Sequence, residues 1–479
     1  MCPGPRTRCI YHRPVSNILN FLQYNESLQQ NRVPITAAGP RQRAFSGGRE
    51  CELSERNYRD AVHNIIRLDN SSAEGRLIES LIDTVEFQRL RRVRQLGLAY
   101  FAYQSAEHSR FTHSLGAFHL ATRILERLNS RYSITYEQQT AVRIAALLHD
   151  IGHGAFSHVI ESILGFHHEQ FSIDAILSDA TDVGRILAGH SRELAANVAA
   201  IIRGNFRPLA LSQLVSSQLD VDRMDYLLRD SLMSGAKYGI YDLEWIIKSI
   251  EIDEENDRLY VAAPGIYAVE DYLQARYYMF RQVYFHRTLR AAETVLRSLL
   301  KRAIDVYAAG GDAWHRPGSA FERILQKQQL TLSEHLSLDD SDVFFHIKQW
   351  QSSADPVLSD LAARFLDRRL FAAFDLDMPS GEVGPFVKEV EALAAARGFD
   401  TRYYVSEDET GDAAYNFYTT DTADAKNLIF VEDGFARPAV REISEVSSAV
   451  RGLQQGLRIH RICFPAELKA DVTAIYHGA

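Results

Sequence analysis

The stretch that decides the fold is Ala145-Ala146-Leu147-Leu148-His149-Asp150-Ile151-Gly152-His153-Gly154-Ala155-Phe156-Ser157-His158. Its first part is an apolar helical run, which we expect to lie in a protein core. That run carries His149 and Asp150 into the core with it, and an unpaired buried ion is costly. A bound metal ion is the simplest compensation, so the stretch predicts a metal centre inside a helical domain.

Two further residues complete a candidate ligand set. They are His113, within Arg110-Phe111-Thr112-His113-Ser114-Leu115-Gly116, and Asp222, within Leu219-Asp220-Val221-Asp222-Arg223-Met224-Asp225-Tyr226. Imidazole and carboxylate ligands together suit Fe, Mn, Zn or Co and leave positions open for water and a phosphate oxygen. Because a bound cation lowers the pKa of its water and polarises phosphorus, the set indicates hydrolysis of a phosphate ester or anhydride. Taken alone, His113 is more often a hydrogen-bonded core histidine than a ligand.

Three candidate histidines follow the His149-Asp150 pair within twenty residues: His153, His158 and His168. Histidine titrates near neutral pH, so such a cluster can protonate a leaving oxygen or orient a water molecule. Each of them is also compatible with an ordinary satisfied polar side chain.

The segment that carries Asp222 continues as a helix, in which Tyr226 and Asp230 follow at four-residue steps and share one face. That face combines a ligand, a hydroxyl donor and a second carboxylate. Structural salt bridging is the alternative for the charged neighbours, and we favour it for Asp225 and Arg229. Arg223 stays open, because a guanidinium also binds phosphate bidentately.

The composition is that of an ordinary globular protein: 479 residues, 46% hydrophobic, 24% charged and a net charge of −9. That charge argues against charge-driven nucleic-acid binding. There is no apolar run near the roughly 18 residues that span a membrane. The four cysteines are scattered without a C-x-x-C spacing, and the N-terminus has no secretory apolar segment. We therefore expect a cytoplasmic protein without a membrane partner.

The pattern of the chain predicts a mainly α protein with a smaller α+β C-terminal region. We expect an N-terminal extension at residues 1–59, a catalytic core at 60–307 and the α+β region at 308–479. Helices are predicted at 76–97, 114–128, 136–148, 191–203, 211–228, 269–304, 359–374 and 385–395. A β-hairpin is predicted at 250–263, and strands at 401–405, 427–431 and 458–464.

At the candidate ligands the sequence resembles the HD-domain metal-dependent phosphohydrolases, whose signature is H…HD…D. Further motifs occur in the order typical of the deoxynucleoside triphosphate (dNTP) triphosphohydrolase branch. They are Phe87-Gln88-Arg89-Leu90-Arg91, Arg94-Gln95-Leu96-Gly97, the two segments quoted around His113 and Asp222, Phe156-Ser157-His158 and His168-Glu169-Gln170. The resemblance spans residues 60–300, with a weaker match beyond that includes Leu338-Asp339-Asp340-Ser341-Asp342. It implies an HD-domain helical bundle as the core.

The resemblance implies hydrolysis of a dNTP to the deoxynucleoside and inorganic triphosphate, with attack at the α-phosphorus. By motif, the residues that would hold the divalent metal are His113, His149, Asp150 and Asp222, and those that would serve proton transfer are His153, His158 and His168. The triphosphate, with Mg bound to the nucleotide, would contact Arg110, Arg223, Tyr226 and Arg276. The sugar pocket would be lined by Gln95, Leu96, Asp230 and Tyr284, with Leu96 excluding a 2′-hydroxyl.

Relatives of this kind are often homo-oligomers, dimers or tetramers, that a nucleotide activates at an inter-subunit site. The corresponding residues here are Asp83, Gln88 and Arg91, for which an ordinary ion pair is the alternative. The chain departs from the vertebrate pattern at three positions. Arg59 replaces an asparagine, Arg223 a lysine and Phe280 a histidine.

Two other functions compete with this one. The first is an HD phosphohydrolase that acts on a different nucleotide: a monophosphate, a cyclic dinucleotide or an alarmone. The second is a non-enzymatic nucleotide sensor. Three arginines, Arg110, Arg223 and Arg276, favour a triphosphate because they exceed what one phosphate needs. Housekeeping of the nucleotide pool and antiviral defence both remain open as the biological role.

Overall fold

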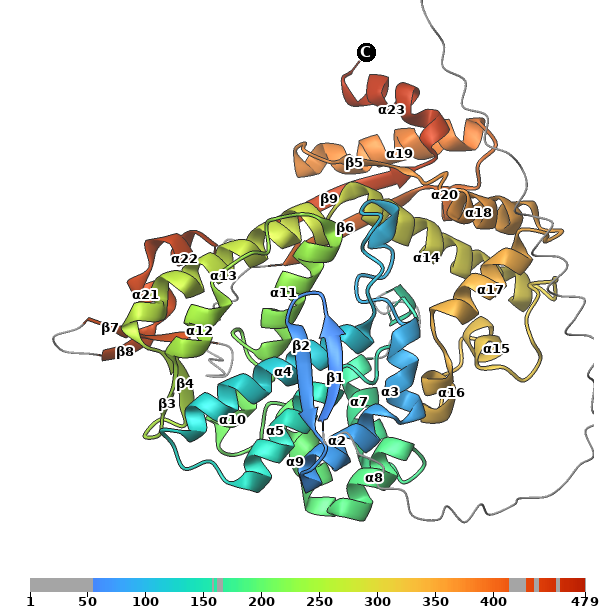
Figure 1. Ribbon diagram of the computed structural model, residues 1–479. Coiled ribbons are helices and arrows are strands. Elements are labelled where there is room, and N and C mark those ends of the chain that lie inside the picture. Colours follow the sequence, from blue (N-terminus) through green and yellow to red (C-terminus); the bar gives the residue numbers. More distant parts are fainter. Residues whose placement is uncertain are drawn as a thin grey trace, which may run out of the picture. The chain divides into compact units, whose positions relative to one another are not determined.

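The core of the protein is a bundle of helices around α4 (Arg110–Asn129), seen in the computed structural model of Figure 1. The structure describes residues 55–156, 159–161, 167–412, 428–434, 439–453 and 457–478. Helix α4 packs between α5 (Tyr136–Leu148) and α11 (Val221–Ser234), and α5 packs in turn on α9 (Arg192–Ile202). The prediction of a mainly α protein is confirmed.

Apolar residues at helical spacing explain this packing. On α4, Leu120, Ile124 and Leu128 are fully buried, and on α5 so are Ile144 and Leu148. Steps of three and four residues place such side chains on one helix face. Burial of that face stabilises the bundle by roughly 1.5–3 kcal/mol for each large side chain.

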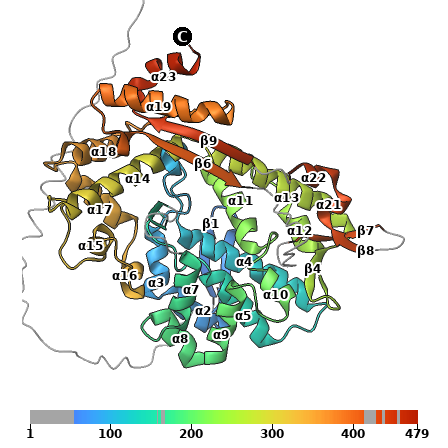
Figure 2. The ribbon, with the colours of Figure 1, turned by 180° about the vertical axis from the view of Figure 1, so that it is seen from behind.

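A second core forms around the long helix α14 (Arg287–Ala308), whose buried face includes Leu296, Leu299 and Leu300. Helix α18 (Pro356–Leu366) packs against α14, and α17 (Asp340–Trp350) packs against α18. The fully buried Trp350 belongs to the same core. Figure 2 shows these helices from behind.

Three small sheets accompany the helices. The hairpin β1 (Glu55–Asp60) and β2 (Asn64–Asp69) is antiparallel, and the predicted domain boundary at residue 59 falls within β1. A four-stranded sheet has the order β3-β4-β7-β8 and a three-stranded sheet the order β5-β9-β6. Their strands are β3 (Ile250–Asp253), β4 (Arg258–Val261), β5 (Ala372–Asp375), β6 (Ser406–Asp412), β7 (Phe430–Asp433), β8 (Ala439–Glu442) and β9 (Leu457–Phe464). The predicted hairpin at 250–263 and the strand at 458–464 are confirmed; of the strand predicted at 427–431, residue 427 lies outside the described residues.

Strand β9 separates two cores because successive side chains alternate between its faces. Cys463 belongs to the core around α14, while Ile462 and Phe464 belong to a third core. Helix α19 (Ser380–Ala396) and helix α23 (Lys469–Tyr476) also contribute to that third core, together with Leu376 and Leu468. The sheet thus joins the C-terminal region to α14.

Several predicted helices are interrupted by capping residues. The helix predicted at 76–97 is α2 (Ala73–Ile82), α3 (Val85–Arg89) and η1 (Leu90–Arg92), because the Thr84 side chain caps α3. The helix predicted at 211–228 is α10 (Leu209–Gln213) and α11, because Asp220 caps α11.

The C-terminal half shows the same effect. The helix predicted at 269–304 is α13 (Ile266–Met279), the π-helical turn η4 (Phe280–Tyr284) and α14, which His286 caps. The prediction of a strand at 401–405 is wrong: α20 (Thr401–Tyr404) is a helical turn because the Asp400 side chain caps it. The end of the helix predicted at 359–374 is likewise wrong, since β5 begins at Ala372.

The remaining elements are short. They are η2 (Ala99–Phe101), α7 (His168–Leu177), α8 (Asp182–His190), α12 (Leu243–Ser249), η3 (Ala263–Gly265), α15 (Ala320–Leu325), α16 (Leu332–Ser337), α21 (Ile443–Val446), α22 (Ser448–Leu453) and η6 (Ala466–Leu468). Among the described residues, no helix is both long and apolar enough to cross a membrane.

Candidate metal centre and active-site cavity

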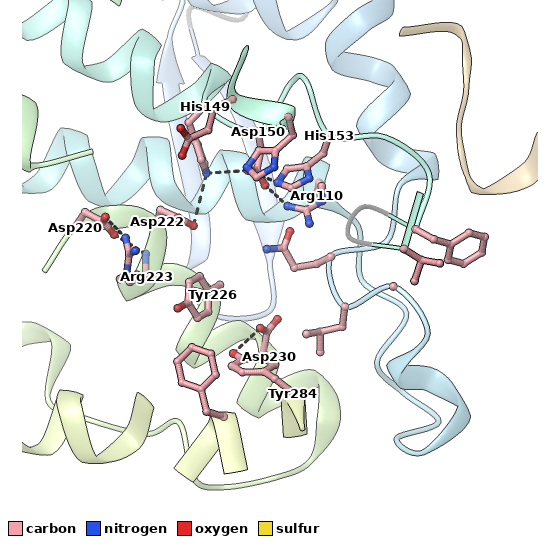
Figure 3. Close-up of a pocket in the computed structure, with 18 of the residues that line it drawn as sticks. Arg110, His149, Asp150, His153, Asp220, Asp222, Arg223, Tyr226, Asp230 and Tyr284 are labelled. Atoms are coloured by element: carbon pink, nitrogen blue, oxygen red, sulfur yellow. Dashed lines mark hydrogen bonds and ion pairs between the residues drawn. The ribbon is translucent and has the colours of Figure 1, made fainter. Parts of the chain in front are cut away.

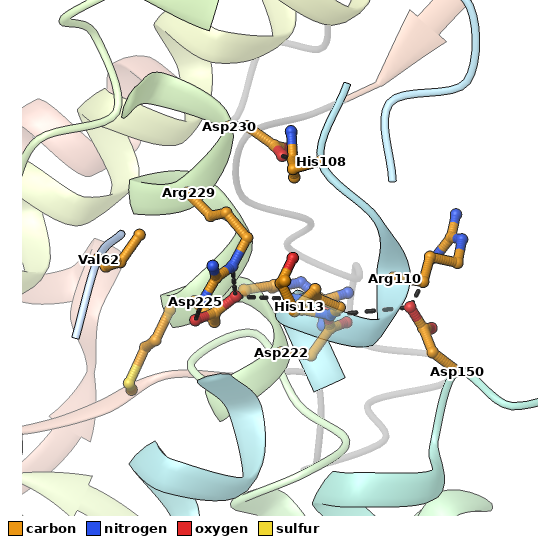
Figure 4. Close-up of polar contacts among 12 residues, drawn as sticks. Val62, His108, Arg110, His113, Asp150, Asp222, Asp225, Arg229 and Asp230 are labelled. Carbon is orange, nitrogen blue, oxygen red and sulfur yellow. Dashed lines mark hydrogen bonds and ion pairs between the residues drawn. The ribbon is translucent and has the colours of Figure 1, made fainter. Parts of the chain in front are cut away.

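Three helices bring the four predicted ligands together. His113 lies in the first turns of α4, His149 and Asp150 at the end of α5, and Asp222 in the first turn of α11. His113 Nε2 lies 3.2 Å from His149 Nε2 and 3.1 Å from Asp222 Oδ1. Asp150 Oδ1 lies 3.4 Å from His149 Nε2, and its Oδ2 3.8 Å from His113 Nε2 (Figures 3 and 4).

The hydrogen bonds of the two imidazoles show that these residues fit a metal ion. His113 Nδ1 donates to Asp225 Oδ2 at 2.8 Å, and His149 Nδ1 donates to the Ala146 carbonyl at 2.9 Å. Both Nε2 atoms are then left with a lone pair, and the two lone pairs face each other at 3.2 Å. Two acceptors at that spacing repel unless a cation or a proton lies between them. The spacing suits two nitrogens bound to one ion with bonds of about 2.1 Å.

Asp225 is the anchor of this arrangement. It is fully buried and accepts from His113, from His63 Nε2 at 2.7 Å, and from Arg229 Nε and Nη2 at 2.8 and 2.9 Å (Figure 4). Arg229 also donates to Asp60 at 2.7 Å. The predicted ion pair between Asp225 and Arg229 therefore exists, and Asp225 additionally orients the candidate ligand His113.

Glycine at position 116 permits this anchor. A Cβ on Gly116 would lie 1.9 Å from Asp225 Oδ1 and 2.5 Å from Arg229 Nη2. Because real Cβ atoms essentially never approach other atoms so closely, any larger residue displaces the carboxylate. The close packing of α4 on α11 thus depends on a residue without a side chain one turn after His113.

Charge in the centre favours occupation by a cation. Burial lowers the pKa of His113, but hydrogen bonds to Asp222 and Asp225 outweigh it and raise that pKa to about 10. Burial raises the pKa of Asp222, but its hydrogen bonds to His113 and His149 hold it far below its usual range. Without a metal, a proton is therefore held between these groups at neutral pH, and a metal ion replaces that proton.

The loop after the ligand pair is held from both sides. Arg89 is buried and donates from Nη2 to the carbonyls of Ile151 and His153, each at 2.8 Å. From the C-terminal region, His335 Nε2 donates to the Gly152 carbonyl at 2.6 Å, and Asp340 Oδ1 accepts from the Phe156 amide at 3.0 Å. These contacts hold Phe156 in the left-handed region, at φ 45°. The Asp340 motif quoted from the sequence thus has a structural role at the site.

Glycine at position 152 has a related role. A Cβ there would lie 2.3 Å from the His168 carbonyl and the Ser172 amide. Helix α7 can therefore lie directly against the loop, and Ser172 Oγ accepts from the Gly152 amide and donates to the His149 carbonyl.

Two of the three predicted proton-transfer histidines lie beside the ligands. His153 Nε2 is 3.3 Å from Asp150 Oδ1, and the ring of His168 stacks on that of His153 with centroids 3.6 Å apart. His168 Nδ1 lies 3.1 Å from Glu161 Oε1. His158 lies outside the described residues.

The geometry of this second group favours proton transfer over metal binding. His153, Glu161 and His168 are close enough together to be considered a ligand set. However, the two rings are nearly parallel, at 17°, so their lone pairs point along separate planes and do not converge on one ion. Burial and the nearby Arg110 hold the pKa of His153 well below its usual range, so its imidazole is neutral.

A cavity of about 730 Å³ opens beside the ligands (Figure 3). Its lining contains every residue predicted for the substrate except Arg276: Gln95, Leu96, Arg110, Arg223, Tyr226, Asp230 and Tyr284. Arg276 is buried behind that lining, where it donates to Gln218 Oε1 at 2.6 Å and lies 5.5 Å from the ring of Phe280. Phe280 itself lines the cavity.

The polar groups of the cavity fall into two sets, one near the metal centre and one at another part of the wall. Arg110 donates to Asp150 Oδ2 at 2.6 Å, and Arg223 pairs with Asp220, so both guanidinium groups lie close to the metal centre. Asp230 accepts from the Tyr284 hydroxyl at 2.9 Å at another part of the wall. Burial raises the pKa of Tyr226 to about 12, so its hydroxyl stays protonated as a donor.

Comparison with known proteins agrees with this geometry. Residues 110–230 match the family model for the HD domain, and residues 241–313 match the model for the HD-associated region. The chain is 34% identical to Uncharacterized protein YwfO of Bacillus subtilis over 434 residues, which cover 90% of this chain and 96% of that protein. The chain belongs to the HD-domain phosphohydrolase family.

Other relatives of this HD-domain protein include a solved structure of a phosphohydrolase from Bacteroides thetaiotaomicron, with a TM-score of 0.74 and 30% identity. The match covers 86% of this chain and 99% of that one. A deoxynucleoside triphosphate triphosphohydrolase SAMHD1 homolog from Dictyostelium discoideum is 31% identical over 242 residues. That alignment covers 47% of this chain and 46% of the homolog.

The residues predicted for an activating nucleotide lie away from the cavity of this HD domain. Asp83 pairs with Arg56 at 2.9 Å, as the ion-pair alternative expects, although the partner is not Arg91. Arg91 Nε donates to Gln88 Oε1 at 2.8 Å, and its guanidinium lies 3.5 Å from the centroid of the Phe111 ring. None of the three lines the cavity described above.

Four residues of the HD-domain site are absent from the sequence-based ligand, catalytic and substrate sets: Asp225, which we interpreted as a salt-bridge residue, and His63, His108 and Glu161. Asp225 had a usable signal in the sequence, since it follows Asp222 by three residues on the same helix. His63 and His108 acquire their roles through partners distant in sequence, and Glu161 acquires its role through His168, seven residues further on. Their contacts therefore require the fold.

Proposed function

We propose that the protein is a metal-dependent dNTP triphosphohydrolase. Water adds to the α-phosphorus, the bond between that phosphorus and the 5′ oxygen breaks, and the 5′ oxygen takes a proton. The products are a deoxynucleoside and inorganic triphosphate. Metal-dependent phosphohydrolase chemistry is expected from the HD domain, and the triphosphate reaction on dNTPs is the proposal.

One observation carries the proposal. A single cavity is lined by His149, Asp150 and Asp222, by two arginines, and by the residues predicted for a sugar pocket. Arg110 and Arg223 lie on the ligand side, where several phosphates need cationic partners. Away from them, Asp230 and Tyr284 present a carboxylate and a hydroxyl for hydroxyl recognition.

Leu96 and Gln95 support a deoxyribose in particular. Leu96 offers only carbon atoms, so a 2′-hydroxyl facing it would lose its hydrogen bonds. Gln95 Oε1 is buried and meets no donor among the described residues, which leaves an acceptor for a ligand hydroxyl. An apolar contact that rejects an added hydroxyl in this way discriminates by about a hundredfold.

The chain's own residues supply the rest of the chemistry. A divalent cation held by His113, His149, Asp150 and Asp222 would act as a Lewis acid on a phosphate oxygen. Arg110 and Arg223 bind and orient the phosphates, and Tyr226 donates a hydroxyl hydrogen. The neutral His153 accepts a proton, and His168, paired with Glu161, is placed to deliver one to the 5′ oxygen.

The test is product analysis of metal-loaded protein with each dNTP, NTP and dNMP, alone and in mixtures. Release of triphosphate from dNTPs supports the proposal. Release of phosphate or pyrophosphate, or turnover of monophosphates, cyclic dinucleotides or alarmones instead, replaces it with another HD phosphohydrolase activity. Binding without turnover makes the protein a nucleotide sensor.

A pair of histidine variants links activity to the metal centre. His149→Ala removes a ligand and is expected to abolish turnover, while His190→Ala changes an exposed histidine at the end of α8 and leaves the rate unchanged. Metal content is measured on both. Wild-type turnover in His149→Ala contradicts the ligand assignment.

We further propose a homo-oligomer that a nucleotide activates through Asp83, Gln88 and Arg91. Their support is the resemblance to oligomeric dNTPases, together with the ion pair of Asp83 with Arg56 and the hydrogen bond of Arg91 with Gln88. The test is the dependence of turnover on a second nucleotide, measured together with mass by light scattering. A rate that is proportional to enzyme and indifferent to a second nucleotide excludes activation.

A further inference from the structure

His108 lies beneath the cavity wall and touches two of the residues assigned to the sugar. Its Nε2 lies 2.7 Å from Asp230 Oδ1, with both side chains buried (Figure 4). Its backbone carbonyl accepts from the Gln95 amide at 3.0 Å. His108 therefore joins α11 to the segment that carries Gln95 and Leu96.

The hydrogen bond to Asp230 determines the tautomer of His108. A carboxylate accepts only, so Nε2 carries the proton and donates it. Nδ1 meets no hydrogen-bonding partner within the described part of the chain. The whole polar function of this side chain is thus its contact with Asp230.

Asp230 is held at both oxygens. Oδ1 accepts from His108 Nε2, and Oδ2 accepts from the Tyr284 hydroxyl at 2.9 Å. Two donors fix the rotation of the carboxylate and leave its other lone pairs available. Because Asp230 lines the cavity, those lone pairs form a preorganised acceptor for a hydroxyl.

We propose that His108 is a positioning residue for the sugar end of the substrate, acting through Asp230 on recognition of the 3′-hydroxyl. The inference rests on the proposed function. A glutamine amide at this position can still donate a hydrogen bond to Asp230, whereas an apolar side chain of similar size cannot. His108→Gln and His108→Leu are therefore the matched pair.

The first test compares kcat/KM for a dNTP with that for the 2′,3′-dideoxynucleoside triphosphate of the same base. His108→Leu is expected to reduce the preference for the 3′-hydroxyl by about tenfold, the worth of one hydrogen bond to a charged group. His108→Gln restores most of it. A purely structural role lowers both kcat/KM values equally and leaves their ratio unchanged, which overturns the proposal.

The second test asks whether His108 acts through Asp230. In the double variant of His108→Leu with Asp230→Ala, the loss of preference should equal that of Asp230→Ala alone, since both changes remove the same contact. If the loss of preference in the double variant equals the product of the losses in the two single variants, the proposal is contradicted.

Equilibrium binding separates this inference from the proposed function. Metal-loaded protein is titrated with deoxy and dideoxy triphosphates whose 5′ oxygen is replaced by a methylene, so no turnover occurs. A preference for the 3′-hydroxyl that His108→Leu removes supports the inference even if no triphosphate is ever released. Equal binding of both analogues by the wild type overturns it even if the protein hydrolyses dNTPs.

Discussion

Asp225→Asn tests the anchor of the metal centre. The Asp225 carboxylate accepts four hydrogen bonds, from His113, His63 and two nitrogens of Arg229. Asparagine keeps one oxygen, and its amide nitrogen then faces two donors, whichever way the side chain turns. Two hydrogen bonds to a charged group are lost, each worth about 1.5–3 kcal/mol. We expect the free energy of unfolding to fall by about 3–5 kcal/mol, the usual cost of breaking a buried ion pair.

The same change weakens the metal site without touching a ligand. His113 loses a charged acceptor at Nδ1, so metal affinity should fall about 10- to 100-fold. Calorimetric metal titration and guanidinium denaturation measure the two effects. Asp271→Asn, at an exposed carboxylate on α13, is the matched control, with an expected change within about 0.5 kcal/mol. If Asp225→Asn matches that control in both assays, the anchor has no such role.

Three further predictions concern the loop at Gly152, the proton held by His113, and the buried His335. Gly152→Ala should lower the free energy of unfolding by about 1–3 kcal/mol, because the added Cβ meets backbone atoms of α7. Gly189→Ala is the control: its Cβ meets nothing within 4 Å, so the free energy of unfolding measured by denaturation should stay the same or rise. Metal affinity should rise with pH up to about 10, because the proton that His113 holds must leave; a calorimetric affinity independent of pH would falsify this. Burial lowers the pKa of His335 to about 4, below its unfolded value, so stability should be complete above about pH 6.5 and fall by up to about 3 kcal/mol towards pH 4. His335→Gln should flatten that profile in acid titration of unfolding, and an unchanged profile assigns the loss to other groups.

The grouping of the candidate metal ligands could be predicted from sequence because its signal is local. His149 and Asp150 end an apolar run, and Asp222 lies in the first turn of a capped helix, so the immediate neighbours of each residue indicate its place. The bundle was predictable for the same reason, since helical periodicity marks the buried faces. The breaks were missed because side-chain caps such as Thr84 and Asp220 end helices within a continuous apolar pattern.

The supporting contacts could not be predicted, because they join residues far apart in the chain. Arg89 meets the loop at Ile151, His335 meets Gly152, and His108 meets Asp230. No periodicity or spacing records such pairs. The placement of Arg276 behind the cavity wall also needs the fold, because its partner Gln218 lies 58 residues away in the chain.

The most direct measurement of the central claim is hydrolysis of a dNTP in water enriched in oxygen-18, followed by phosphorus NMR and mass spectrometry of the products. Attack of water at the α-phosphorus predicts one labelled oxygen at one end of inorganic triphosphate and none in the deoxynucleoside. Label in phosphate or pyrophosphate, or in the deoxynucleoside, would contradict the proposed reaction.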